Sequence, residues 1–194
     1  QFTGKNDPQN NSGGDLTTPT DKWMLGSNEG YALGASYDLP MGLSFATVYN
    51  QAGKTAEQEK YAAFGGNDDA KLASVGVRYA ANNWYAAATY SDGRNHYALG
   101  SDSAPSGYAE KNRGYEAVVQ YTVANKFVPS LAYVRSDVKD SSQNIDDTAN
   151  EYLSLGASYK FTPAFQTYVD YKVNLLDKNT FTSQYGINTD DVVA

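Results

Sequence analysis

The side chains of this chain that could take part in chemistry are almost all carboxylates, lysines and arginines. His96 is the only histidine, and cysteine is absent. A lone histidine without cysteines or paired acids beside it indicates a surface residue, and no Ser-His-Asp arrangement is supported. Three acid pairs lack the glycine-centred spacing of a calcium loop, which favours solvated loop acids. They are Asp68–Asp69, Asp146–Asp147 and Asp190–Asp191. We therefore predict no enzyme, no cofactor and no resident metal.

Other charged residues alternate with apolar ones. Asp170 and Lys172, separated by Tyr171, would lie about 7 Å apart on one face of a strand. Such charges cannot be packed in an apolar core, so this face must meet water. They either influence the passage of ions directly or form a charge ladder that only keeps the face wet. The predicted wet face comprises Asp38, Arg78, Glu116, Gln120, Lys160, Asp170, Lys172 and Asn174.

Tyrosines identify the elements that must position these charges. Four times, a strand ending in tyrosine turns tightly and a second tyrosine follows about twelve residues later. The lower series, beside the short turns, is Tyr37, Tyr79, Tyr121 and Tyr159, and the upper series is Tyr49, Tyr90, Tyr133 and Tyr171. We predict that both series face lipid at constant heights, because tyrosine suits a site that is apolar at one end and wet at the other.

The connections between these hairpins are long and polar. They lie near residues 53–70, 92–112, 138–150 and 177–190, and a further polar stretch, 5–28, precedes the first hairpin. Short turns at one end and long loops at the other favour an outer-membrane barrel over a soluble sandwich. We predict an all-β, antiparallel, up-and-down transmembrane β-barrel. Residues 1–194 would form one partial domain, with eight complete strands and a strand stub at each end of a piece of a longer protein.

The net charge of −7 excludes a typical nucleic-acid binder, which would carry a basic patch. Loop acids would raise the cation concentration at a pore mouth, which predicts a mild preference for cations. These acids include Asp7, Asp15, Asp21, Glu57, Glu59, Asp102 and Asp140. Arg135 belongs to the tyrosine face beside the 138–150 loop, at headgroup height. It is either a lipopolysaccharide phosphate contact or a snorkelled surface arginine.

Several segments carry a resemblance to a known family. Lys111–Tyr121, Val128–Tyr133 and Tyr168–Asn174 resemble the C-terminal half of the trimeric general diffusion porins of Gram-negative outer membranes. Ala80–Tyr85 resembles the same family's mid-barrel periplasmic turn. The resemblance implies a 16-stranded barrel in the bacterial outer membrane. It also implies homotrimers with water-filled pores through which small hydrophilic solutes and ions diffuse passively.

The resemblance does not extend to the family's constriction. The first six strands, the inward-folded third loop and the C-terminal aromatic strand have no counterpart here, so no constriction residue is carried over. Phe64–Asp68 looks like the family's Phe-Gly-Gly-acid motif, but its position predicts an external loop.

Two other functions stay open at this point. One is a small outer-membrane barrel acting as an adhesin or receptor through its external loops, and the other is a soluble, tyrosine-rich, carbohydrate-binding sandwich. External loops of a porin could also meet phage or bacteriocins.

Overall fold

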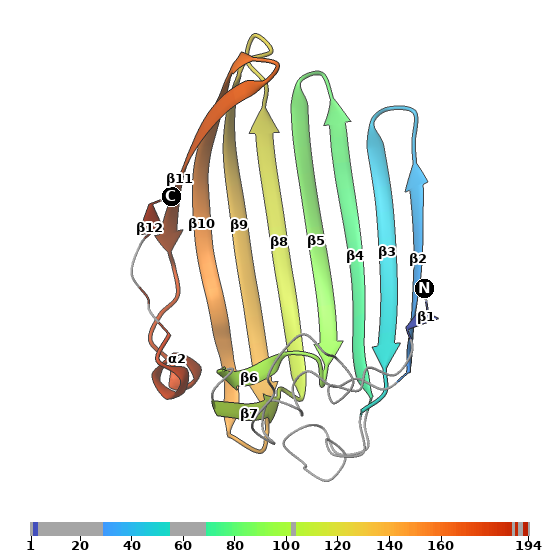
Figure 1. Cartoon of the computed structure of the whole chain (residues 1–194), viewed down its shortest axis with the longest axis vertical. Helices are drawn as coiled ribbons and strands as arrows, with labels where there is room; N and C mark the ends of the chain where they lie inside the picture. The colour runs from blue at the N-terminus through green and yellow to red at the C-terminus, as the bar shows by residue number, and fades with distance from the viewer. Residues whose placement is uncertain are drawn as a thin grey trace.

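The computed structural model describes residues 2–3, 29–54, 69–101, 104–187, 189 and 192–193. These residues form one antiparallel sheet of ten strands, in which strands that are neighbours in sequence are neighbours in space (Figure 1). The strands are β1 (Phe2–Thr3), β2 (Gly30–Asp38), β3 (Leu43–Ala52), β4 (Ala70–Ala81), β5 (Trp84–Arg94), β8 (Lys111–Tyr121), β9 (Phe127–Asp140), β10 (Ile145–Thr162), β11 (Phe165–Asn174) and β12 (Val192–Val193). Outside this sheet lie β6 (Ala98–Ser101), β7 (Ala104–Tyr108) and α2 (Thr180–Tyr185).

The short turns have the chemistry that their backbone geometry requires. Asn82 and Asn83, between β4 and β5, both have positive φ, 52° and 64°, as the central residues of a type I′ hairpin turn do. Gly42 ends the β2–β3 turn at φ 83°, and its carbonyl accepts a hydrogen bond from Ala80 N at 2.8 Å. The turns therefore reverse the chain within a few residues, and those after β2, β4 and β8 also accept a backbone hydrogen bond from the next hairpin.

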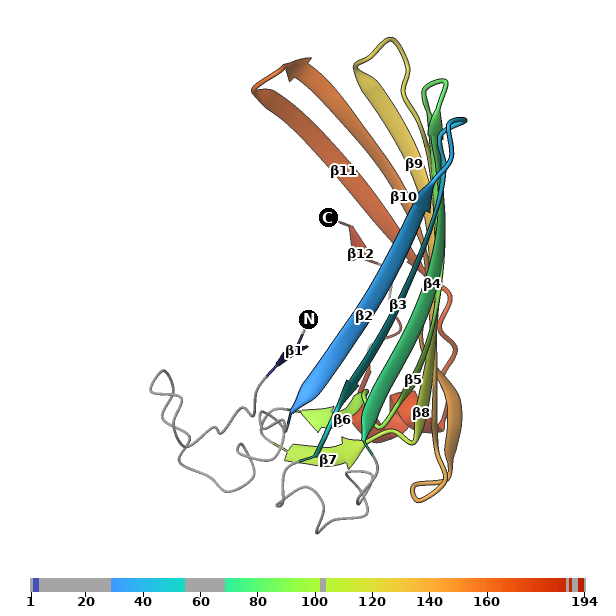
Figure 2. The same ribbon diagram turned by 90° about the vertical axis from the view of Figure 1, so that its right-hand side faces the viewer.

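The sheet is curved and does not close on itself in this chain. β2 pairs with β1 and β3, and β11 pairs with β10 and β12, so the two outer long strands are not joined to each other. The sheet bends into a trough, and β1 and β12 both lie on its concave side (Figure 2). The predicted all-β, antiparallel, up-and-down architecture is confirmed, with eight long strands and a two-residue strand at each end.

The strand register explains how tyrosines can keep one height in tilted strands. The row that contains Tyr37 reaches β4 at Val77, and Tyr79 stands two residues nearer the turn. The row of Tyr79 reaches β8 at Val119, and Tyr121 again stands two residues nearer the turn. The upper series shows the same two-residue step. The row of Tyr90 reaches β9 at Arg135, two residues from Tyr133, and the row of Tyr133 reaches β11 at Val173, two residues from Tyr171. A constant step of this kind is the stagger that tilted strands of a barrel require.

The loop end of the sheet contains more regular structure than its polar sequence indicates. β9 and β10 continue through most of residues 138–150 and leave a turn at 141–144, while 92–112 contains the β6–β7 hairpin and 177–190 contains α2. These elements bury a small cluster on the concave side, which we call the cap. The cap core comprises Leu99, Ala109, Val138, Ile145, Ala149 and Phe181.

Helix α2 is short but capped at both ends. The Asn179 side chain accepts from Thr182 N, while Thr182 Oγ1 accepts from Asn179 N, each at 2.8 Å. Gly186 follows the helix with φ 63°. Asparagine, threonine three residues later and a terminal glycine are local helix signals that a polar-loop interpretation overlooks.

Candidate functional site

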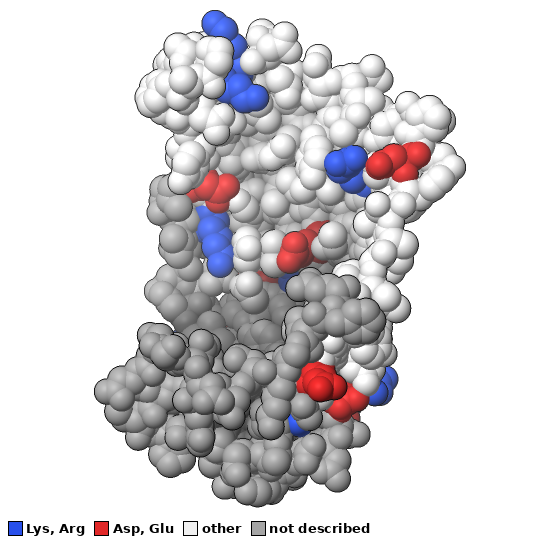
Figure 3. Space-filling view, turned by 45° about the vertical axis from the view of Figure 1, so that its right-hand side comes forward, with Lys and Arg blue, Asp and Glu red and all other residues white. Residues whose placement is uncertain are grey.

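All eight residues predicted for the wet face share one face of the sheet. A single register row runs from Asp38 through Ser44 to Arg78, and continues across the middle strands to Ser154 and Lys172. Viewed from its concave side, the sheet shows charged side chains in small groups among uncharged neighbours, acid beside base in several of them and basic alone at the top of the view (Figure 3). Contact of these residues with water in a pore stays a prediction.

The first group on this face lies near the β2–β3 turn. Arg78 donates to Ser44 Oγ at 2.9 Å and approaches Asp38 Oδ1 at 3.6 Å. The Arg78 and Asp38 side chains are 53% and 74% exposed, so the pair is screened by solvent and holds its members in place only weakly. The register of neighbouring strands brings the two charges together, because Asp38 is paired with Ser44 and Ser44 with Arg78.

The second group lies across β10 and β11. Ser154 Oγ is 2.6 Å and 2.7 Å from the two carboxylate oxygens of Asp170 and donates its one proton to that carboxylate. A Cβ added to Gly156 would come within 2.9 Å of Asp170 Oδ2, so this glycine leaves the space that the carboxylate occupies. Lys172 Nζ lies 3.8 Å from the centre of the Tyr152 ring, a cation–π contact.

Glu116 stands apart from these groups. It lies on the same face, between Thr89 of β5 and Val134 of β9, and is exposed. Among the described residues, no lysine or arginine nitrogen lies within 4.0 Å of its carboxylate. Glu116 is therefore a fixed negative charge that the neighbouring strands leave uncompensated at short range. Gln120, Lys160 and Asn174 complete the set on this face.

The opposite, convex face carries most of the exposed large apolar side chains. All eight tyrosines of the two series lie on this face, five of them exposed and three, Tyr49, Tyr79 and Tyr133, half-buried. Cross-strand aromatic contacts reinforce the lower edge, where the Trp84 and Tyr121 rings lie 4.7 Å apart, and the upper edge, where Tyr90 and Tyr115 lie 5.2 Å apart. Exposed apolar examples are Leu33, Tyr37, Phe45, Val75, Leu131, Leu155 and Val169. An apolar face of this extent on a sheet whose other face is charged is typical of a strand layer between lipid and water.

Arg135 lies on the convex face, where it is already engaged by carboxylates. Its Nε is 2.9 Å from Asp137 Oδ1, and its Nη1 is 3.8 Å from Glu151 Oε1. Glu151 also accepts from the Tyr133 hydroxyl at 2.7 Å, and Asp137 from the Thr148 hydroxyl at 3.0 Å. The predicted lipopolysaccharide contact is thus a guanidinium with two acidic neighbours, and its role stays a prediction.

The acid pairs do not form paired sites in the described residues. Asp146 lies 3.4 Å from Lys139 Nζ, whereas Asp147 accepts from Phe181 N at 3.0 Å and so fixes α2. Asp140 is 4% exposed and accepts from the backbone of Ser142, which makes it a turn residue rather than a solvated acid. Within the described ranges, no three His, Cys, Asp or Glu side chains gather as metal ligands would.

Several predicted residues lie outside the described ranges. They are Phe64–Asp68, Asp190, Asp191, and the loop acids Asp7, Asp15, Asp21, Glu57, Glu59 and Asp102. His96 lies in the loop between β5 and β6 and is exposed.

Sequence reasoning missed Lys54, which follows β3 and is only 5% exposed. Its ammonium donates to the carbonyl of Asn95 at 2.8 Å and lies 4.0 Å from the centre of the Tyr108 ring. Burial lowers the pKa of Lys54 to about 8, while the charge of Asp69 acts in the opposite direction. Nothing in the local sequence marks this lysine, because its partners lie about forty to fifty residues away.

No helix in the described residues is long and apolar enough to cross a membrane.

Comparison with known proteins explains the two-faced sheet. The Gram-negative porin family matches residues 1–194. Outer membrane porin C of Rahnella aquatilis is 38% identical over 87% of this chain and 50% of the relative, and that of Salmonella typhimurium is 39% identical over 88% and 49%. The chain thus spans about half the length of these curated relatives.

A solved structure has the same strand arrangement. The Salmonella typhi OmpF structure in complex with daunomycin superposes with a TM-score of 0.81 at 28% identity, covering 100% of this chain and 53% of that one. Three findings point to the same family: the family match over the whole chain, the named relatives and this superposition. They fit a sheet that is charged on its concave face and apolar on its convex face. The chain therefore belongs to the Gram-negative porin family and is an outer-membrane protein.

Proposed function

We propose that the protein of which this chain is part forms a water-filled channel through which small hydrophilic solutes and ions diffuse passively. The observation that carries this proposal is the separation of faces: eight polar and charged residues share the concave face, while tyrosines and aliphatic residues cover the convex face. Continued around a wide barrel, this alternation produces a wet lumen and a lipid-facing wall.

The charges of the concave face support passage of ions without a tight binding site. The predicted lining holds three acids and three bases: Asp38, Glu116 and Asp170 against Arg78, Lys160 and Lys172. The three negative and three positive charges of this lining cancel. The mild cation preference that we propose therefore comes from the excess acids of the loops and from the net charge of −7. The solved Salmonella typhi relative holds daunomycin, which supports access of small molecules to proteins of this fold.

We further propose that the protein is a homotrimer in contact with outer-membrane lipid, with external loops accessible to phage or bacteriocins. Arg135 stays a proposed lipopolysaccharide contact, with Asp137 and Glu151 positioned to hold its guanidinium. A small closed barrel of eight strands acting only as an adhesin is not favoured, because β2 and β11 pair with β1 and β12 and not with each other.

Planar-bilayer recordings of the full-length protein test the channel. We expect stepwise conductance, with each insertion adding steps in groups of three if the trimer is correct. A reversal potential in a salt gradient should show mild cation preference. Full-length protein that inserts into bilayers without any conductance would contradict the channel, and anion preference would contradict the proposed selectivity alone.

A further inference from the structure

A shallow hollow lies on the concave face of β2 to β5, towards their short-turn end. Small residues on adjacent strands leave this space: Ala46 of β3, Gly76 of β4 and Ala87 of β5. Its volume is about 380 Å³. At about 30 Å³ per water, the hollow holds roughly a dozen waters, which a small solute would displace.

Gly76 allows the hollow to be filled without changing any charge. A Cβ added at Gly76 would stand 3.4 Å from Thr89 Cγ2 and 3.6 Å from the carbonyl oxygen of Ala88, which is ordinary van der Waals contact. A short side chain at this position would therefore occupy the hollow without a clash against the backbone.

Arg78 stands at one end of the hollow. Its hydrogen bond to Ser44 and its approach to Asp38 both use Nη2, and within the described residues its guanidinium makes no further hydrogen bond or ion pair. The solvent-screened carboxylate of Asp38 competes only weakly for it. A guanidinium binds a carboxylate through two parallel hydrogen bonds, so Arg78 is suited to the carboxylate of a solute.

Glu116 lies just beyond the other end. Thr89 lines the hollow and pairs directly with Glu116 of β8, while Gly76, two residues from Arg78, pairs with Thr89 from the other side. Two strand spacings and two residues along a strand therefore separate Arg78 from Glu116, or about 12 Å between their Cα atoms. An uncompensated acid and an accessible base thus stand across an uncharged stretch of wall.

This arrangement matches a solute with a carboxylate at one end and an ammonium at the other. An extended peptide of two or three residues is about 7–10 Å long, which suits the separation because each ion pair adds its own length. The Thr89 hydroxyl between the two charges can donate to or accept from an amide group of such a peptide. A dicarboxylate would instead meet Glu116 as a like charge.

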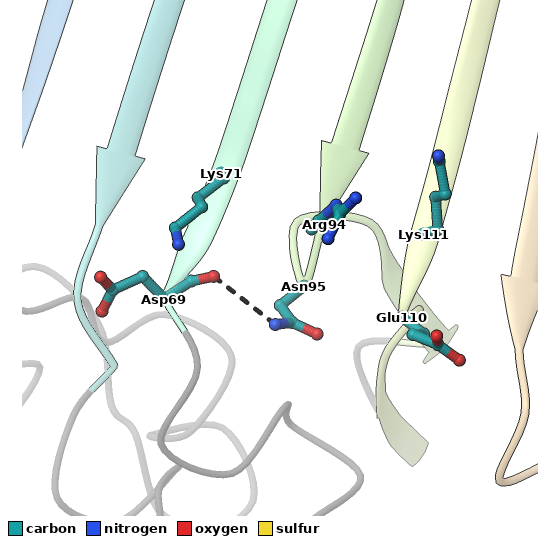
Figure 4. Close-up of a pocket in the computed structure, with 6 residues that line it drawn as sticks. All are labelled: Asp69, Lys71, Arg94, Asn95, Glu110 and Lys111. Atoms are coloured by element: carbon teal, nitrogen blue, oxygen red, sulfur yellow. Dashed lines mark hydrogen bonds between the residues drawn. The ribbon is translucent and has the colours of Figure 1, made fainter.

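Other cations of the same strands lie on the opposite face. Lys71 of β4 pairs with Arg94 of β5 in a row of cations beside a separate cavity of about 300 Å³ at the loop end (Figure 4). Lys71 is seven residues from Arg78, so the alternation of side chains places it on the convex face, about 24 Å away along the strand. Lys71 therefore provides a control for Arg78, with the same charge on the same strand.

We propose that the hollow is a weak subsite for short peptides with free termini, in which Arg78 binds the carboxylate and Glu116 binds the ammonium. The small residues between them give the peptide backbone room to lie against the wall. This inference rests on the proposed channel, because it requires the concave face to line a pore.

Current fluctuations of the full-length protein in planar bilayers, recorded with trialanine in solution, test the subsite. Arg78→Gln and Glu116→Gln should each weaken trialanine binding about fivefold, because each removes one charge-assisted contact in a solvated site. Gly76→Val should weaken it by a similar factor, because the new side chain fills the hollow while every charge is retained. Gly76→Ala should cause a smaller loss in the same direction, and it replaces Gly76→Val if that variant does not fold.

Two blocked peptides assign each terminus to one residue. N-acetyl-trialanine lacks the ammonium, so Glu116→Gln should leave its binding within about twofold, whereas Arg78→Gln should still weaken it about fivefold. Trialanine amide lacks the carboxylate, and the opposite result is expected for it. A general electric field in the pore would instead change the binding of both blocked peptides in both variants, so this crossed result is specific to two local contacts.

Two matched controls should leave trialanine binding within about twofold of the unmodified protein. Lys71→Gln removes a cation from the convex face of β4. Gly34→Val enlarges a glycine of the concave face that does not line the hollow, and a Cβ there would also make only ordinary contact, 3.5 Å from the carbonyl oxygen of Thr47. Circular dichroism verifies that the variants are folded.

Unchanged trialanine binding in folded Arg78→Gln and Gly76 variants, or an equal loss in either control, would overturn the subsite. Conductance in salt alone is recorded first for every protein. A protein that conducts normally but lacks the crossed result contradicts only the subsite, whereas insertion without conductance contradicts the proposed channel.

Discussion

At the scale of single residues, Glu116 differs from the other acids of the concave face. Asp38 faces Arg78, and Asp170 accepts a hydrogen bond from Ser154, whereas the described residues place no cation within 4.0 Å of Glu116. A unit charge about 10 Å from a permeating ion in water contributes about 0.4 kcal/mol, or roughly a factor of two in local concentration. Glu116 is therefore an acid of this face whose charge can act directly on ions.

Glu116→Gln should consequently lower the cation-to-anion permeability ratio by up to about fourfold, because the local cation concentration falls and the local anion concentration rises by about twofold each. Reversal potentials of the full-length protein in a salt gradient measure this ratio. Asp146→Asn is the matched control, because it removes the same charge from the convex register beside Lys139. An unchanged ratio in Glu116→Gln, or an equal change in the control, would show that Glu116 only keeps the face wet.

Lys54 makes the loop end sensitive to pH. Its pKa is lowered from 10.5 to about 8, first by burial, so the folded loop end binds fewer protons than the unfolded chain between these values. The cost of burying the charge is fully present below about pH 8 and is relieved as the pH rises towards 10.5. Stability of the loop end should thus increase with pH across this window.

Hydrogen-exchange protection factors of the Asn95 and Ala109 amides, which are hydrogen-bonded within this loop, report on that stability. They should rise between about pH 8 and about pH 10 in the unmodified protein. In Lys54→Met the rise should disappear, although the hydrogen bond to Asn95 O is also lost. A rise of the same size in Lys54→Met would mean that another group titrates there.

At the scale of elements, the tight turns connect each hairpin to the next. A Cβ at Gly42 would stand 2.6 Å from the carbonyl oxygen of Ala80, and Gly42 also has φ 83°. Gly42→Ala should therefore destabilise the sheet by about 1–3 kcal/mol, because both strain and the backbone clash oppose the new methyl group. The midpoint of guanidinium unfolding of the full-length protein in detergent measures this loss.

Gly186→Ala separates the two contributions. Gly186 also has positive φ, 63°, but a Cβ there would meet nothing within 4 Å. It should cost only about 1 kcal/mol. Equal losses in both variants would contradict a role for the clash with Ala80.

The cap illustrates how distant elements meet. Leu99 and Phe181 come from two different polar connections, yet both are almost fully buried, against Val138 of β9 and Ile145 of β10. Their register places the cap on the concave side, over the trough (Figure 2). The cap therefore belongs to the wall of the proposed channel mouth.

At the scale of the whole molecule, the charge distribution makes the proposed selectivity depend on salt. Acids of the loops act over distance, and the screening length falls from about 10 Å at 0.1 M salt to about 3 Å at 1 M. The cation preference should accordingly weaken over this range. Reversal potentials at a fixed concentration ratio but different mean salt measure it, and a constant preference would instead indicate local binding of ions in the lumen.

The sequence by itself determined the eight long strands, their turns and the division of residues between two faces. Period-two alternation and turn residues such as Asn82 and Asn83 are local signals, so they can be recognised without knowing what each strand contacts. The tyrosine spacing also predicted a barrel-like order, since each hairpin repeats the same local pattern.

Only the tertiary structure decided what each charged residue meets. The stagger between hairpins, the carboxylates beside Arg135, the burial of Lys54 and the cation row of Lys71 and Arg94 all depend on pairing between residues far apart in the chain. Strand register and loop packing are set by the summed contacts of whole strands, and no local pattern records them. The sequence therefore determined the two faces, whereas the fold determined which charges on them are compensated.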